Sequence, residues 1–244
     1  MPNIYAIDFG VSNFAAVVCN DGSSMLYKGG AFLSECQWFH KKRAQAVSII
    51  TKGHEHMHAS SRYLSALSRH HADFIKDQCH KISRSIINYC MEHQAGTLVL
   101  GENKRWKQDC DMGSQNNQNF VSMPTGLLKQ MIIYKASDAG IKIIMQEESY
   151  TSQADITAMD YIPVYGVDAE NAVFSGKRIS RSLYRCFNGM IINADCNGAA
   201  NIMRKAITDA WNSITDFSFL ASPEVSGFHE LNPLSISVKG IAAA

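Results

Sequence analysis

Three acidic side chains, Asp8, Glu102 and Asp195, stand next to segments with the patterns of regular structure. Asp8 and Glu102 each follow an apolar run typical of a buried strand, and Asp195 precedes a run with helical spacing. If the first and fourth strands are neighbours, their carboxyl ends and a helix start can meet at one edge of the sheet. Oxygen ligands grouped without Cys or His are what Mg²⁺ or Mn²⁺ prefers. The alternative is that the three residues serve only as turn, loop and helix-cap residues.

Two divalent ions held about 4 Å apart by such carboxylates would have a defined chemistry. They can activate a water molecule and stabilise the leaving oxygen of a phosphodiester. The acidic residues therefore indicate a nuclease site, provided that the chain folds so that they meet.

The elements that must position these residues alternate between strands and helices. Three short apolar runs joined by tight turns predict an antiparallel meander, and a helical pattern broken at Gly53 predicts a hairpin of two helices. A fourth strand, a helix that starts at Pro124 and is closed by Gly140, and a fifth strand follow. The expected strands are 5–10, 14–19, 25–27, 97–100 and 141–145, and the helical hairpin spans 32–93.

The last predicted helix runs from Gly198 to about Trp211, with its N-cap supplied by Asp195 or Asn197. The tail beyond Ser213 has no clear pattern. This order predicts an α/β fold in which a mixed five-stranded sheet has helices on both faces.

Composition narrows the class of protein. The chain has 244 residues, a net charge of +1 and 46% hydrophobic residues, which suits one large domain with a real core. Neither a membrane-spanning apolar run nor a secretory signal is evident, so we expect a soluble, cytoplasmic protein without a membrane partner. Seven scattered cysteines without a C-x-x-C pair favour free thiols over a zinc site.

Four segments in a fixed order resemble the RuvC-like nuclease domain of the TnpB/OrfB transposon proteins. They are 7–13 (IDFGVSN), 100–108 (LGENKRWKQ), 148–153 (ESYTSQ) and 193–202 (NADCNGAANI), with 174–179 and 183–185 belonging to the same pattern. The resemblance implies an RNase H-like fold and a Mg²⁺- or Mn²⁺-dependent DNA endonuclease, with relatives that are guided by RNA. Asp8 then matches the first catalytic aspartate and Asp195 the last. The nuclease domain is expected over 1–205, with a helical insertion at 32–94, and 206–244 as helix end and tail.

This chain departs from the family pattern at three points. Gly101 stands where family members have a glutamate, and Glu102 follows one residue later. A slip of one residue turns a side chain to the other face of a strand, so Glu147 or Glu148 is the alternative third carboxylate. The cysteine pairs of the family's zinc ribbon are missing, so no zinc is expected. The chain also starts at the nuclease core, as an N-terminally truncated relative would, which leaves the use of a guide RNA open.

Two basic groups are candidates for nucleic-acid contact. The densest cluster, close in sequence to Asp195, favours phosphate contacts over a solvated hairpin. In the polar loop after Glu102, a tryptophan flanked by basic residues could stack on a base or anchor the loop on the core. The clusters are Lys177, Arg178, Arg181 and Arg185, and Lys104, Arg105, Trp106 and Lys107.

Two other functions compete with the nuclease. A net charge of +1 and the shifted glutamate favour a catalytically weak or inactive truncated relative, which either binds DNA or RNA or is a remnant that only folds. The run Ile7-Asp8-Phe9-Gly10 also resembles the first phosphate loop of actin-like ATPases, but two nucleotide-clasping lobes need a longer chain than this one. Oligomeric state and target sequence are left open.

Overall fold

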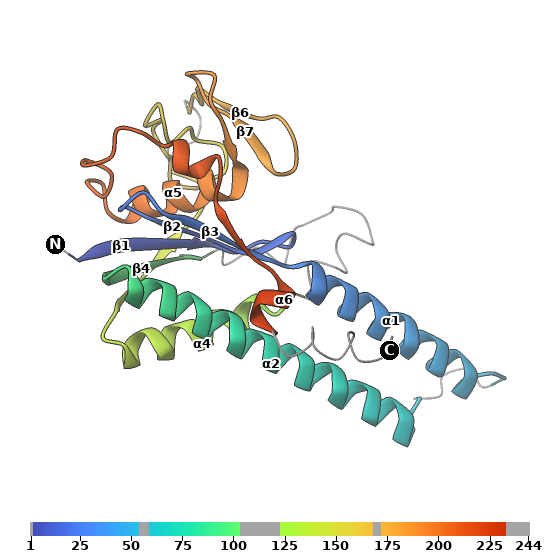
Figure 1. Cartoon of the computed structure of the whole chain (residues 1–244). Coiled ribbons are helices and arrows are strands. Elements are labelled where there is room, and N and C mark those ends of the chain that lie inside the picture. The colour runs from blue at the N-terminus through green and yellow to red at the C-terminus, as the bar shows by residue number, and fades with distance from the viewer. Residues whose placement is uncertain (1, 54–58, 103–122, 168–171, 233–244) are drawn as a thin grey trace, which may run out of the picture.

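The main sheet contains six strands in the order β5-β4-β1-β2-β3-β9 (Figure 1). The computed structural model describes residues 2–53, 59–102, 123–167 and 172–232. Three strands form the antiparallel meander β1-β2-β3, while β4, β5 and β9 join by parallel pairing. The strand bounds are β1 Asn3–Asp8, β2 Asn13–Cys19, β3 Ser24–Lys28, β4 Ala95–Glu102, β5 Lys142–Glu147 and β9 Glu224–Ser226.

Strands β1 and β4 lie side by side, which confirms the predicted neighbourhood. Ile7 pairs with Leu100 in a parallel register, so Asp8 and Gly101 reach the same edge of the sheet. Successive side chains of a strand alternate between the two faces. Ile7 and Leu100 belong to the apolar cluster on one face, and Val99 belongs to the cluster on the other.

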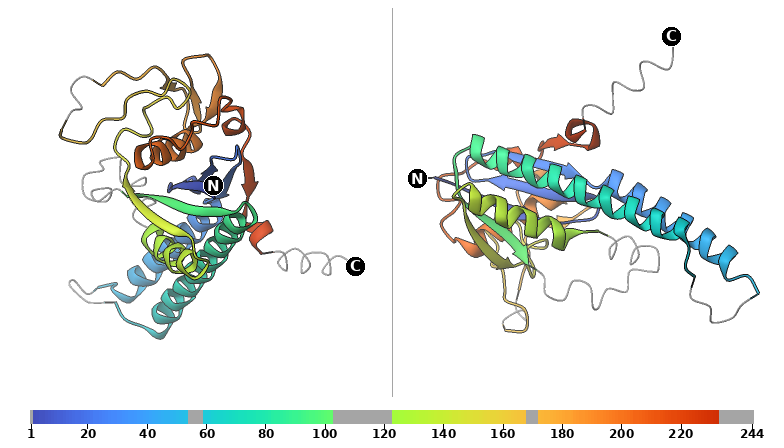
Figure 2. Two further views of the ribbon diagram at one scale, coloured as in Figure 1. Left: turned by 90° about the vertical axis from the view of Figure 1, so that its left-hand side faces the viewer. Right: turned by 90° about the horizontal axis from the view of Figure 1, so that it is seen from below.

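Helices cover both faces of the sheet, as the sequence predicted (Figure 2). One face packs against α2 (Arg62–Glu92) and α4 (Thr125–Asp138), and the other packs against α5 (Ala194–Ala206). The helix after Pro124 is confirmed, with Pro124 at its N-cap. None of the helices in the described part of the chain has the length and apolar character needed to cross a membrane.

Helix α1 (Gly30–Ile50) and α2 form the predicted helical hairpin, which extends well beyond the sheet (Figure 1). The hydroxyl of Ser61 caps α2 by accepting a hydrogen bond from the Leu64 backbone N–H at 3.1 Å. The apolar cluster against the sheet includes Phe32 of α1 and Cys79 of α2 but neither Leu64 nor Leu67, so the hairpin joins this cluster at its end nearest the sheet.

The C-terminal region differs from the prediction in its helix. Helix α5 begins at Ala194 and ends at Ala206, short of the expected Trp211. Its N-cap is Asn193, whose Oδ1 accepts from the N–H groups of Asp195 and Cys196 at 3.0 and 3.1 Å, so neither expected cap residue has that role. Trp211 keeps the apolar spacing because the chain folds back, and its Nε1 donates to the carbonyl of Ala200 at 3.1 Å.

The tail also supplies a strand, so the predicted five-stranded sheet is wrong by one. Strand β9 pairs with β3 at the edge of the sheet, and the short helix α6 (Phe228–Leu231) follows. A second, three-stranded sheet precedes α5 in the order β6-β7-β8, with bounds Lys177–Arg178, Leu183–Arg185 and Ile191–Asn193. This small sheet stands above the face that α5 covers (Figure 1).

Candidate active site

Asp8 ends strand β1 and lies against helix α5. A Cβ placed on Gly198 of α5 would be only 2.7 Å from Asp8 Oδ2, so the glycine leaves the room that this carboxylate occupies. Burial raises the pKa of Asp8 well above its ordinary value, and the negative charges of Glu148 and Asp195 raise it further. The positive charges of Arg178 and Lys129 partly oppose this rise. Asp8 therefore lies within a group of carboxylates that destabilise one another.

Glu148 lies next to Asp8, at the place that a side chain on position 101 would occupy. A Cβ on Gly101 would be 2.5 Å from Glu148 Oε2 and 2.9 Å from Ile202 Cδ1. Glu102 is the next residue of β4, and strand alternation directs its side chain to the face of Leu100, which packs against α2 and α4. Because the glutamate stands at position 102 rather than 101, its side chain lies on the face opposite Asp8. The space at Gly101 is occupied by the carboxylate of Glu148 instead.

Glu147, the other alternative, is held elsewhere. Its Oε2 lies 2.6 Å from the Lys205 amino group, and its Oε1 accepts from the Ser149 N–H at 2.6 Å. Burial acts to raise the pKa of Glu147, but the hydrogen bonds from Lys205 and Ser149 outweigh it and lower the pKa. Glu147 therefore links the end of β5 to the end of α5.

Asp195 lies in the first turn of α5, where both of its carboxylate oxygens have partners. Asn13 Nδ2 donates to Oδ2 at 2.7 Å, and Arg178 Nη2 lies 3.2 Å from Oδ1. The Lys28 amino group donates to Asn13 Oδ1 at 3.0 Å, which fixes the orientation of the Asn13 amide. The chain Lys28–Asn13–Asp195–Arg178 thus joins β3, β2, α5 and the small sheet at the edge where Asp8 lies.

The loop after Glu148 is held by two buried asparagines of α5. Asn197 Nδ2 donates to the Ala154 carbonyl at 2.8 Å, and Asn201 Nδ2 donates to the carbonyls of Ala154 and Thr151 at 2.7 and 3.0 Å. The Thr151 hydroxyl in turn donates to the Glu148 carbonyl at 2.7 Å. This support was not predicted from the sequence, although two asparagines four residues apart in the otherwise apolar stretch 196–203 are a signal for it.

Lys129 of α4 is a further residue that was not predicted from the sequence. Its amino group donates to the Gly101 carbonyl and lies 4.8 Å from the centre of the Phe9 ring. Burial lowers the pKa of Lys129, while the carboxylates of Glu148, Glu102 and Asp8 act in the opposite direction. Lys129 therefore brings a positive charge to the carboxylates from the α4 side, and nothing in its local sequence indicates this.

The predicted basic cluster lies on the small sheet. Lys177 pairs with Arg185 across β6 and β7, and both side chains are exposed, as is that of Arg181. Arg178 reaches Asp195 and is itself held by the carbonyls of Ser180 and Arg181. The other predicted group lies outside the described residues; it is Lys104, Arg105, Trp106 and Lys107.

The donors at this edge suit a divalent cation. Within the described residues, no three side chains of Asp, Glu, His or Cys are arranged as a ready-made metal cage. The negative charges of Glu148 and Asp195 add to burial in raising the pKa of Asp8, and a bound cation would offset this repulsion between the carboxylates. Hard carboxylate oxygens are the ligands of Mg²⁺ and Mn²⁺.

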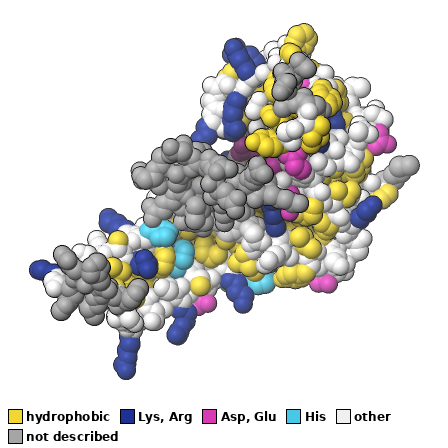
Figure 3. All heavy atoms as spheres, turned by 180° about the vertical axis from the view of Figure 1, so that it is seen from behind, with side chains coloured by type: hydrophobic (Ala, Val, Ile, Leu, Met, Phe, Trp, Pro, Cys, Tyr) yellow, Lys and Arg dark blue, Asp and Glu magenta, His cyan; other side chains and the backbone are white. Residues whose placement is uncertain are grey.

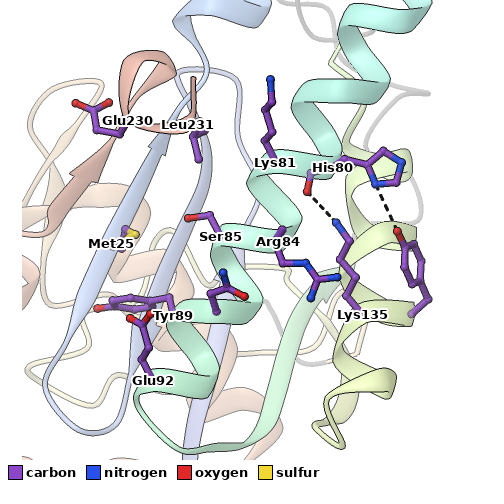
Figure 4. A pocket seen from close by; sticks show the side chains of 12 residues that line it. Met25, His80, Lys81, Arg84, Ser85, Tyr89, Glu92, Lys135, Glu230 and Leu231 are labelled. Atoms are coloured by element: carbon purple, nitrogen blue, oxygen red, sulfur yellow. Dashed lines mark hydrogen bonds between the residues drawn. The ribbon is translucent and has the colours of Figure 1, made fainter. Parts of the chain in front are cut away.

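A separate cavity of about 700 Å³ opens between α2, α4 and the C-terminal segment (Figure 4). Lys135, only 4% exposed, borders it and donates to the His80 carbonyl at 2.8 Å and to Ser83 Oγ at 2.6 Å. Arg84 and Glu92 line the same cavity, so its charges are mixed. None of the three carboxylates at the Asp8 edge borders it.

Comparison with known proteins identifies two matching family models. Residues 3–107 match the OrfB_IS605 family, described as a probable transposase, and residues 126–202 match the Cas12f1-like TNB domain. The TnpB-like protein ORF457 of Acidianus two-tailed virus is 25% identical over 219 residues, which are 86% of this chain and 43% of that protein. The CRISPR-associated endodeoxyribonuclease Cas12f1 of Sulfoacidibacillus thermotolerans is 32% identical over 132 residues, 54% of this chain and 27% of that enzyme.

Solved structures share the fold. The cryo-EM structure of a Cas12f1–sgRNA–target DNA complex matches with a TM-score of 0.58 and 16% identity, over 82% of this chain and 49% of that one. A CRISPR-Cas12f ternary complex matches with a TM-score of 0.54 and 18% identity, over 82% and 38%. The chain spans less than half the length of these curated relatives and solved chains. The N-terminal part of the chain is thus similar to OrfB_IS605 proteins, the C-terminal part to the Cas12f1-like TNB domain, and most of its length to a TnpB-like protein, which is consistent with the TnpB family.

Proposed function

We propose that this protein is a transposon-associated, divalent-metal-dependent DNA endonuclease with an RNase H-like, RuvC-type core. The observation that carries the proposal is the convergence of Asp8, Glu148 and Asp195 at one edge of the sheet. An antiparallel three-stranded meander followed by two parallel strands supports the RNase H-like assignment. The domain assignment, with the nuclease over 1–205 and the helical insertion over 32–94, belongs to the same proposal.

Each residue has a role that follows from its contacts. Asp8, Glu148 and Asp195 would hold Mg²⁺ or Mn²⁺, which when bound supplies Lewis-acid activation of water and of the phosphodiester. Gly101 and Gly198 leave room for the carboxylates, and Asn13 orients Asp195. These groups act by fixing the donor oxygens before substrate arrives, which lowers the cost of organising the site.

The basic residues of the small sheet would position the substrate strand. Arg178 balances the charge of Asp195, and its guanidinium can form paired hydrogen bonds with a phosphate. Lys177, Arg181 and Arg185 are exposed around it and can contact neighbouring phosphates. We assign DNA as substrate and a guide RNA as partner because the matched Cas12f1 structure is a complex with both. Lys104, Arg105, Trp106 and Lys107 remain candidates for the same strand.

A titration that compares the three candidate glutamates tests the proposal. We expect calorimetry to show saturable Mn²⁺ binding to the wild-type protein that is lost in Glu148→Gln, Asp8→Asn and Asp195→Asn. Glu102→Gln and Glu147→Gln are matched controls, and both should keep it. Binding that survives Glu148→Gln but not Glu102→Gln would assign the third carboxylate to β4. Absence of Mn²⁺ binding in a folded wild-type protein would contradict the proposal as a whole.

A second function is favoured by one observation. Both oxygens of Asp195 are engaged by Asn13 and Arg178, as they would be in a relative that binds nucleic acid without cleaving it. Such a protein would bind DNA or RNA through its basic residues and show neither Mn²⁺ binding nor cleavage. The titration above therefore separates the two functions.

A further inference from the structure

The positive charge of this protein is concentrated on the outer half of the helical hairpin. Residues 40–72 contain six Lys and Arg but only one acidic residue, a net charge of +5, whereas the whole chain has +1 and the remainder therefore −4. We call the described part of this segment, 40–53 and 59–72, the basic arm; it contains no Asp or Glu. Its Lys and Arg residues are Lys41, Lys42, Arg43, Lys52, Arg62 and Arg69.

The cations of the basic arm are available to a partner. Five of the six are exposed, and Lys42 is half-buried. None of them forms a salt bridge with a carboxylate of the described residues, since the salt bridges found there involve other side chains. Figure 3 shows basic side chains projecting from several sides of the hairpin, at the lower left, with few acidic ones among them. A surface of this kind attracts a polyanion.

The two helices that carry the arm pack against each other at its inner end. Phe39 of α1 stacks on His71 of α2 with ring centres 4.1 Å apart, and the rings of Trp38 and His70 lie edge to face at 6.2 Å. Farther along the arm, Leu64 and Leu67 of α2 are also buried. These contacts hold the two helices of the hairpin together, so the cations of both helices belong to one surface.

Helix α1, which carries the first part of the arm, starts near the edge where the carboxylates lie. Helix α1 begins two residues after Lys28, which is joined to Asp195 through Asn13. With a rise of about 1.5 Å per residue, Lys41 lies roughly 16 Å along α1 from Gly30, and the helix ends at Ile50, roughly 30 Å from Gly30. At about 3.4 Å per base pair, these distances correspond to roughly 5 to 9 base pairs.

We propose that the basic arm binds the phosphate backbone of the duplex that flanks the strand held at Asp8, Glu148 and Asp195. The inference rests on the proposed function for the nature of its ligand. A duplex is favoured over a single strand because the arm offers several cations for each exposed aromatic ring, whereas single strands are held largely by stacking. The arm lends affinity without sequence preference, because phosphate contacts do not read bases.

The salt dependence of binding tests the proposal. Fluorescence anisotropy would measure the affinity for a DNA duplex of about 20 base pairs, two helical turns, without divalent ions so that cleavage cannot intervene. The slope of log K against log [salt] changes by about 0.9 for each phosphate that the protein no longer neutralises. A variant without four of these cations should therefore have a weaker salt dependence, with the magnitude of the slope reduced by up to about 3.6. The four substitutions are Arg43→Gln, Lys52→Gln, Arg62→Gln and Arg69→Gln. Lys142→Gln, at an exposed position of β5, is the matched control and should leave the slope unchanged.

An unchanged slope in a variant whose circular dichroism matches the wild type would overturn the proposal. If the four-fold variant lost the wild-type binding to anionic lipid vesicles but kept its duplex binding, the proposal would also be overturned and the arm would be assigned to a membrane surface. The same measurement with an RNA–DNA hybrid of the same sequence shows which duplex the arm prefers. The four-fold variant should lose the same affinity for both duplexes, because both carry the same backbone charge. The four-fold variant should still bind Mn²⁺. If the wild type binds no Mn²⁺ while the slope still falls, the nuclease proposal fails and the arm remains a duplex-binding element.

Discussion

Gly198→Ala probes the site through one added carbon atom. The new Cβ would lie 2.7 Å from Asp8 Oδ2, whereas ordinary contacts begin at 3.4 Å, so the carboxylate has to move by about 0.7 Å. The strand cannot retreat, because Ile7 and Phe9 on either side of Asp8 are fixed in the core. The displacement therefore falls on the Asp8 side chain.

The change should separate stability from function. Alanine is favoured over glycine within a helix by about 1 kcal/mol, so the variant should fold. Sites that position reacting groups tolerate displacements of only about 0.5 Å, and 1 Å can cost about 100-fold in rate. We therefore expect Mn²⁺-dependent cleavage to fall by about 10- to 100-fold.

Thermal melting with and without Mn²⁺ is the assay that needs no substrate. At a Mn²⁺ concentration of about 100 times Kd the wild type should gain about 2.7 kcal/mol, or roughly 5–11 °C in Tm. Gly198→Ala should lose most of that gain. Gly126→Ala is the matched control, because its Cβ meets nothing within 4 Å in α4, and it should keep the full gain. A Gly198→Ala variant that retains the wild-type gain would refute the role of this contact.

Three further predictions concern single side chains. Because the folded-state pKa of Asp8 is raised, the metal-free protein should lose stability as the pH rises from about 4 through that pKa. Asp8→Asn should then melt higher than the metal-free wild type at neutral pH and gain nothing from Mn²⁺, as calorimetry at pH 5 and 8 would show. Burial lowers the pKa of His71, which outweighs the opposing effect of Glu35, so stability should be lost as the pH falls below about 6.5 through the lowered pKa. Urea unfolding at pH 5 and 7 should show a smaller loss for His71→Gln. Trp211→Ala should cost about 3–5 kcal/mol in urea unfolding, because Trp211 is 2% exposed.

Sequence patterns predicted the strands and helices in which apolar residues recur at a regular spacing. Alternating and continuous apolar runs indicated β1 to β5, and helical spacing indicated the hairpin and α4. Strand β9 could not be found in this way, because Glu224–Ser226 is only three residues long and its pairing with β3 joins segments about two hundred positions apart. The predicted end of the last helix was wrong because Trp211 has the spacing of an apolar residue within the helix. In the structure, α5 ends before it and the chain folds back so that Trp211 packs on the helix.

The N-cap of α5 was ambiguous because three cap-forming residues stand close together in its sequence. Asn193, Asp195 and Asn197 can each accept hydrogen bonds from a helix start. The structure resolves the choice through partners far away in the sequence, since Asp195 is bound by Asn13 and Arg178, and Asn197 by Ala154. With Asn193 as the cap, the Asp195 carboxylate is left for the edge of the sheet.

Glu148, which we propose as the third carboxylate, would show how tertiary structure can compensate for a one-residue slip. From the sequence, Glu102, Glu147 and Glu148 were all open, and strand alternation argued against Glu102. Strands β4 and β5 are parallel neighbours, so their carboxyl ends reach the same edge, and a carboxylate missing from one strand can be supplied by the other. Such a replacement needs empty space where the original side chain stood. Gly101 provides it, because any side chain at that position would overlap the Glu148 carboxylate.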